Sequence, residues 1–144
     1  RIGDLISIKV GQVRDLKAGE CVRIIEKKTG KENILCVNKV SHKVLHDYLS
    51  AESIADKDYL FRSRQGGHLN EKHAHRMIKS WCHGIKGNYG SHTLRKTFGY
   101  MQRVKYGVGI EILMKRFNHA TPKHTLDYLC VADEEVQDCL LNEI

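Results

Sequence analysis

The sequence contains no apolar run long enough to cross a membrane, since none approaches the roughly 20 apolar residues that such a helix needs. It shows no secretory signal, because the chain opens at Arg1 without a basic segment followed by an apolar run. A starting Met, internal repeats and low-complexity linkers are also lacking. We therefore expect a single domain over residues 1–144, taken from the C-terminal part of a longer cytoplasmic protein.

Cysteine pairs with metal-binding or redox spacing are absent. The five cysteines stand at positions 21, 36, 82, 130 and 139, and no two of them form a Cys-x-x-Cys motif. An odd number without such spacing is typical of reduced thiols in a cytosolic protein. The sequence thus predicts free cysteines and no disulfide framework.

Acidic residues are scarce in the middle of the chain. Residues 62–105 hold ten Lys or Arg and one acid, Glu71, whereas residues 127–144 hold six acids and no Lys or Arg. The net charge is +7 and the pI is about 9.2. Such a basic segment is either a solvated face or a phosphate-binding surface. A two-metal nuclease is disfavoured, because it needs clustered acids that this segment does not offer.

Hydrophobic spacing predicts a mainly helical α+β fold with one small antiparallel sheet near the N-terminus. Two apolar runs around a Gly-containing turn indicate a β-hairpin, with residues 21–26 and 33–37 as strands and 27–31 as its tip. Asn70 and Ser91 are suited to cap helices, and Pro122 is suited to a first helical turn. Residues 1–8 are expected to form the end of a helix, and further helices are expected over 39–52, 70–83, 92–106, 109–117, a segment from 121, and 133–141.

Four residues of the C-terminal half form a pattern with chemical meaning. His92 and Arg95 stand at i and i+3 near the start of a predicted helix and therefore share one face. Such a pair suits an anion, because free backbone N–H groups at a helix N-terminus add to its charge. His119 lies just past the next helix, and Tyr128 comes nine residues later. We expect the intervening turn and short helix to bring Tyr128 back near His119.

The order and spacing of these residues resemble the signature of the tyrosine recombinase (phage integrase) family. Arg1 and the Ile, Gly, Asp and Leu after it resemble the first arginine motif of the family. Lys28 and the Thr and Gly after it resemble its hairpin lysine, and residues 60–69 resemble the segment before its His-Arg motif. The resemblance runs from Arg1 into the acidic tail and implies the family's catalytic-domain fold. The N-terminal helical domain that clamps DNA in this family is absent from these residues.

The resemblance implies a site-specific recombinase that cleaves and rejoins double-stranded DNA through a 3′-phosphotyrosyl link, without metal, other cofactor or ATP. Tyr128 is then the nucleophile. Its phenol, whose ordinary pKa is about 10, needs a proton acceptor, for which His92 is the candidate. Lys28 resembles the general acid that protonates the departing 5′ oxygen, with Lys27 and Lys31 as close alternatives.

Two arginines and a second histidine are the candidates for stabilising the phosphate. The guanidinium forks of Arg1 and Arg95 suit the charge on the non-bridging oxygens, and His119 adds a further donor. Two positions depart from the family pattern. Asn118 stands where Gly is commoner, but Asn also tolerates a left-handed backbone. Lys96 stands where a His often follows the second Arg.

The predicted helix over residues 70–83 carries a basic stripe. Lys72, Arg76 and Lys79 recur at i, i+4 and i+7, and so share one face that we expect to lie along DNA. Arg62 and Arg64 in the preceding loop are further candidates for phosphate contact. The apolar residues of this helix are expected in the core; they are Met77, Ile78 and Trp81.

Several alternatives remain open at this point. A DNA-binding module with the same fold and no activity would use the basic residues alone, and a protein–protein adaptor would bind with weak salt dependence. A zinc site among the histidines of segment 68–83 fits no spacing typical of structural zinc. In the family, the acidic tail often packs on a neighbouring subunit, and the resemblance implies a homo-oligomer, a tetramer on DNA; packing of the tail against its own chain stays open as the alternative. The host can be a phage, a mobile element or a chromosome-maintenance system.

Overall fold

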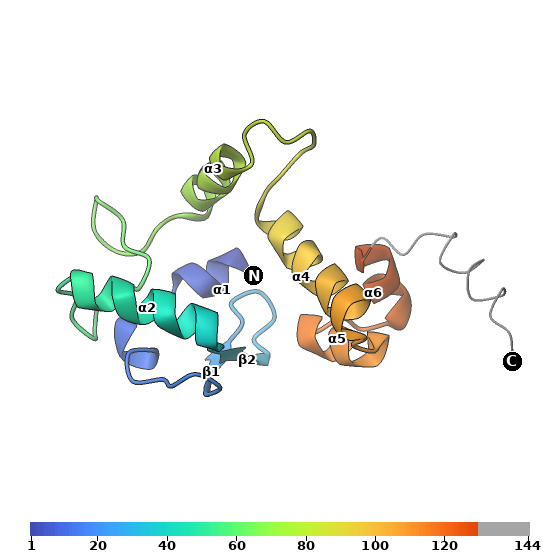
Figure 1. Cartoon of the computed structure of the whole chain (residues 1–144), viewed down its shortest axis with the longest axis horizontal. Helices are drawn as coiled ribbons and strands as arrows, with labels where there is room; N and C mark the ends of the chain where they lie inside the picture. The colour runs from blue at the N-terminus through green and yellow to red at the C-terminus, as the bar shows by residue number, and fades with distance from the viewer. Residues whose placement is uncertain (130–144) are drawn as a thin grey trace, which may run out of the picture. The chain divides into compact units, whose positions relative to one another are not determined.

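The computed structural model describes residues 1–129 and confirms the expected fold class, mainly helical with one two-stranded antiparallel sheet (Figure 1). The expected helix over 133–141 and the acidic tail lie outside the described residues. The described elements are α1 (Ile2–Ile6), a 3-10 helix (Val10–Gln12), β1 (Cys21–Ile25), β2 (Glu32–Cys36), α2 (Lys39–Ala51), α3 (Glu71–Trp81), α4 (Ser91–Tyr106), α5 (Ile110–Phe117) and α6 (Pro122–Leu129).

The chain divides into two compact units. The first comprises Arg1–Ser91, and the second begins at His92. The first unit holds the hairpin and helices α1 to α3, and the second holds almost all of α4 together with α5 and α6. Each unit has its own buried residues.

The hairpin forms at the predicted place. Its strands pair in antiparallel register from Cys21 opposite Cys36 to Ile25 opposite Glu32, and burial alternates along both strands. The turn closes with two backbone hydrogen bonds: the Glu26 N–H donates to the Lys31 carbonyl (2.9 Å), and the Gly30 N–H donates to the Glu26 carbonyl (2.8 Å). Gly30 has a φ of +65°, a left-handed conformation that glycine adopts without strain.

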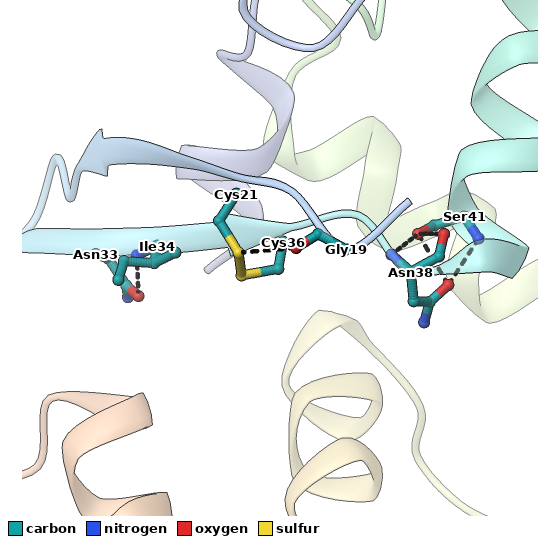
Figure 2. The surroundings of a disulfide bond; sticks show 7 residues. All are labelled: Gly19, Cys21, Asn33, Ile34, Cys36, Asn38 and Ser41. Carbon is teal, nitrogen blue, oxygen red and sulfur yellow. Dashed lines mark hydrogen bonds between the residues drawn. A yellow bond between two sulfur atoms is a disulfide. The ribbon is translucent and has the colours of Figure 1, made fainter. Parts of the chain in front are cut away.

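The prediction of free thiols is wrong for the hairpin, where Cys21 and Cys36 form a disulfide (Figure 2). Because the register places them directly opposite, their Cα atoms lie 4.0 Å apart. Sequence spacing does not reveal strand register, and for this reason the count of cysteines did not indicate the pair. Among the described residues, Cys82 is a free thiol, as expected.

Helix α2 follows the hairpin and begins with a reciprocal cap that Figure 2 displays. The Asn38 side chain accepts from the Ser41 N–H (2.8 Å), and the Ser41 hydroxyl accepts from the Asn38 N–H (2.9 Å). Its apolar face is open, since Val40 and Val44 are exposed. These side chains line a groove of about 690 Å³, together with apolar residues of α1, β2 and the loop before α3.

The core of the first unit joins α1, α3 and the intervening loops. Ile6, Ile8 and Ile78 are buried, and the Leu60 N–H donates to the Ile8 carbonyl (2.8 Å). Asn70 caps α3 as predicted, accepting from the His73 N–H at 2.7 Å.

The prediction that Trp81 is a core residue is wrong, because its side chain is 67% exposed. Trp81 is the last residue of α3, where the chain turns into a glycine-containing loop, and most of its side chain is left uncovered. Of the other two residues assigned to the core, Ile78 is buried and Met77 is half-buried.

The second unit is a cluster of three helices around Phe117, drawn in yellow to red in Figure 1. Leu113, Phe117 and Leu129 form its buried core. Helix α4 approaches closely at Gly99, where an added Cβ would lie 2.6 Å from a Leu129 methyl carbon and 2.7 Å from the Phe117 ring. The position therefore requires glycine for packing, although it lies inside a helix.

Candidate active site

The corner between α5 and α6 sets the direction of the second histidine. Helix α5 ends at Phe117, and Asn118 follows with φ 57° and ψ 38°. This left-handed residue reverses the chain, so the expectation that Asn serves here in place of Gly is confirmed. The His119 N–H then donates to the Met114 carbonyl (3.0 Å), which ties the corner back onto α5.

The predicted approach of Tyr128 to His119 is confirmed. Their ring centroids lie 5.1 Å apart with an interplanar angle of 80°. The His119 Nδ1 lies 3.1 Å from the hydroxyl oxygen of Thr125, which is fully buried, and this contact fixes the orientation of the imidazole. His119 and Tyr128 are half-buried, and the phenol oxygen of Tyr128 is itself buried.

The Phe117 ring is the platform of the site, in the sense that the site's side chains pack against it. Its ring lies 5.4 Å from His119 and 5.3 Å from Tyr128, centroid to centroid. The guanidinium carbon of Arg95 lies 4.9 Å from the centre of the same ring, and an Arg95 Nη donates to the Phe117 carbonyl (3.3 Å). The structure therefore gathers Arg95, His119 and Tyr128 around one buried aromatic ring.

Helix α4 also carries Lys96 and His92. The ammonium of Lys96 lies 5.4 Å from the centre of the Tyr128 ring, a contact that the sequence did not indicate. His92 lies in the first turn of α4 and is exposed.

In the first unit, Arg1 pairs with an acid that is not among the predicted site residues. Its guanidinium forms an ion pair and hydrogen bond with Glu26, whose side chain is fully buried. Lys28, the other candidate of this unit, is exposed in the hairpin turn between the strands, as are Lys27 and Lys31. The candidate residues are thus distributed over both units: Arg1 and Lys28 in the first, and His92, Arg95, His119 and Tyr128 in the second.

The candidate DNA-contact residues are all exposed. Lys72, Arg76 and Lys79 follow one face of α3, and an Arg76 Nη lies 3.4 Å from the His73 Nδ1. Arg62 forms an ion pair with Glu52 (3.0 Å), so part of its charge is already neutralised.

No three His, Cys, Asp or Glu side chains within residues 1–129 are grouped so as to hold a metal ion. None of the helices in this range is both long and apolar enough to cross a bilayer.

Sequence comparison identifies the family to which this geometry belongs. The phage integrase family matches residues 1–135. The chain belongs to this family. Among the curated members, it is 29% identical over 140 residues to "Probable integrase/recombinase YoeC" of Bacillus subtilis, covering 93% of this chain and 72% of that protein. It is 28% identical over 144 residues to the tyrosine recombinase of Pseudothermotoga lettingae, covering 97% and 48% respectively.

Solved recombinase structures share the fold. The crystal structure of XerA recombinase superposes with a TM-score of 0.76 and 25% identity, covering 96% of this chain and 51% of XerA. The XerH recombinase, solved in a post-cleavage complex with its difH substrate, gives a TM-score of 0.71 at 17% identity, with 97% and 41% coverage. The chain spans about half the length of XerA and of the Pseudothermotoga protein.

Proposed function

We propose that this chain is the catalytic domain of a site-specific DNA recombinase that cuts and rejoins DNA through a covalent bond to Tyr128. The observation that carries the proposal is the grouping of Tyr128, His119 and Arg95 around Phe117 in a chain of the phage integrase family. A phenol nucleophile beside a histidine and a guanidinium is the arrangement needed for attack on an anionic phosphodiester.

The first chemical step forms one bond and breaks another. The Tyr128 oxygen attacks phosphorus while its proton passes to a base, for which His92 is our candidate. The bond from phosphorus to the 5′ oxygen breaks, and Lys28 protonates that oxygen. Arg1, Arg95 and His119 bind the non-bridging oxygens, where charge develops.

The second step is the reverse reaction with a different strand. A 5′ hydroxyl attacks the 3′-phosphotyrosine and gives its proton to the neutral Lys28 amine, the phosphorus–tyrosine bond breaks, and Tyr128 recovers its proton from His92. The bond energy is conserved in the intermediate, so ATP is not needed, and the Arg and His side chains take the place of a metal ion in binding the phosphate charge. We infer that the partner is a double-stranded attachment site, bound by a homo-oligomer such as a tetramer in the cytoplasm of a bacterial host.

Covalent trapping tests this function. The longest available form of the protein is mixed with nicked duplex carrying its attachment site, in the presence of EDTA, and denaturing gels are examined for a protein–DNA adduct. We expect an adduct from the wild type and none from Tyr128→Phe, because the variant lacks the nucleophilic oxygen. Tyr106→Phe, at an exposed tyrosine of α4, is the matched control and should form the adduct normally.

The same experiment separates the alternatives. Tight, salt-sensitive binding without any adduct from the wild type would identify an inactive DNA-binding module instead. An adduct that persists in Tyr128→Phe would show that another residue is the nucleophile. An adduct that is lost in EDTA would contradict metal-free chemistry.

We also propose that the exposed stripe of α3 contacts the DNA backbone. Each phosphate contact releases counterions, so removing one should flatten the plot of log K against log salt by about 0.9. We expect Lys72→Ala, Arg76→Ala and Lys79→Ala each to reduce the slope by that amount, measured by fluorescence anisotropy over a salt series. Lys43→Ala is the control, because Lys43 is exposed on α2 and paired with Asp47 (2.7 Å). Unchanged slopes in the α3 variants would remove the stripe from the DNA interface.

A further inference from the structure

Glu26 is a buried acid at the junction of β1 and the hairpin turn. It continues the half-buried face of the strand, on which Val22 and Ile24 precede it at intervals of two residues. The residue is 1% exposed. A buried carboxylate is very costly unless it is paired and hydrogen-bonded, so the contacts of Glu26 define what it holds in place.

Three side chains from three segments converge on this carboxylate. Arg1, which precedes α1, forms an ion pair with Oε2. The Thr29 hydroxyl in the turn donates to the same oxygen (2.6 Å), and the Asn33 side-chain amide in β2 donates to Oε1 (2.7 Å). A single carboxylate therefore joins the start of α1 to both the turn and the returning strand.

The backbone near Glu26 is tied down as well. Besides the two main-chain hydrogen bonds that close the turn, the Lys27 N–H donates to the side chain of Asp4 (2.8 Å), a second buried acid. Asp4 lies in α1, three residues after Arg1. Both neighbours of Lys28 are therefore hydrogen-bonded to a buried acid: Lys27 to Asp4, and Thr29 to Glu26.

We propose that Glu26 is a positioning residue, which orients the Arg1 guanidinium and fixes the turn that carries Lys28. This inference rests on the proposed function, in which Arg1 and Lys28 act on the phosphate and on the leaving oxygen. Glu26 acts through these two residues and does not touch DNA. Its carboxylate keeps both groups in a single relative geometry, and a misplacement of about 1 Å can cost on the order of 100-fold in rate.

The test compares two charge-neutralising variants of the same hairpin in the longest available form of the protein. Glu26→Gln keeps the shape and removes the charge that holds Arg1. Glu32→Gln is the matched control, because Glu32 is an exposed acid of β2 that pairs with Arg23. The rate of adduct formation is measured in single turnover at saturating nicked DNA, and the dissociation constant is measured separately.

We expect Glu26→Gln to lower the saturated rate at least about tenfold while the dissociation constant stays within about twofold, since positioning affects the transition state more than binding. Glu32→Gln should change neither. Thr29→Val removes one donor to the same carboxylate and should give a smaller loss of rate. If Glu26→Gln fails to fold by circular dichroism, Thr29→Val decides the question.

A second measurement does not depend on activity. Backbone amide hydrogen exchange of residues 27–30 should be faster in Glu26→Gln than in wild type and Glu32→Gln, because the turn loses its anchor. An unchanged rate and unchanged exchange in Glu26→Gln would overturn the inference, as would weaker DNA binding with an unchanged saturated rate. If the wild type itself forms no adduct, the proposed function fails, and the exchange data alone decide whether Glu26 positions the turn.

Discussion

Replacing Arg95 with Ala is expected to slow adduct formation by about 100- to 1000-fold, the usual cost of removing one preorganised donor from a developing charge. The guanidinium is fixed by the Phe117 ring and by its hydrogen bond to the Phe117 carbonyl, so it needs little reorganisation to bind phosphate. Arg95→Lys should also be impaired, because an ammonium keeps the charge but loses the planar fork. Single-turnover rates at saturating DNA measure both variants.

Lys105→Ala is the control for this experiment. Lys105 is an exposed cation of the same helix, and its ammonium lies 5.6 Å from the Tyr106 ring centre. Its removal changes the net charge by the same amount and should alter the saturated rate by less than about threefold. An Arg95→Ala enzyme as fast as Lys105→Ala would contradict the role assigned to Arg95.

Replacing Phe117 with Ala is expected to lower the free energy of unfolding by about 3–5 kcal/mol, the usual range for removing a buried aromatic ring. The ring is 2% exposed and packs with Leu113 and Leu129. It also contacts both His119 and Tyr128, so adduct formation should fall together with stability. Urea denaturation followed by circular dichroism gives the change in stability.

The control for Phe117 lies on the same helix. Ile112 is exposed in α5, and its replacement with Ala should change the free energy of unfolding by less than about 0.5 kcal/mol. If Phe117→Ala unfolded at the same urea concentration as Ile112→Ala, the ring would not support the core of this unit, and the platform assigned to it would be wrong.

The helices and the hairpin were predictable because their signals are local. The cap at Asn70, the glycine-containing turn near Gly30 and the start of α6 at Pro122 are set by residues a few positions apart. The Cys21–Cys36 disulfide and the exposure of Trp81 were not predicted, because each depends on which residues meet across space. Strand register decides the first, and the packing around the end of α3 decides the second.

The candidate site, too, was only partly predictable from the sequence. The approach of Tyr128 to His119 was predictable, because nine residues with a turn and a short helix return the chain over a short distance. The role of Phe117 was not, since an apolar residue at the end of a helix is usually an ordinary core residue. The burial of Glu26 could have been predicted, because it continues the half-buried face of β1 at intervals of two residues. An acid buried there needs hydrogen-bonding or charged partners.

The Cys21–Cys36 disulfide bears on the proposed cytoplasmic location, where we expect its two thiols to be kept reduced. Such bonds are rare in cytosolic proteins, where thiols are kept reduced, and both Cys21 and Cys36 are exposed to solvent and to cellular reductants. The hairpin that they join carries Lys28 in its turn. The backbone pairing of the two strands and the contacts of Glu26 do not involve the disulfide. The hairpin therefore does not depend on the disulfide alone.

The most direct test of the central claim is to identify the amino acid that is linked to DNA. The trapped adduct is digested with nuclease and protease, and the peptide that carries the residual nucleotide is sequenced by mass spectrometry. We predict a 3′-phosphate ester on the oxygen of Tyr128. A nucleotide attached to any other residue, or joined through its 5′ phosphate, would contradict this account of the protein.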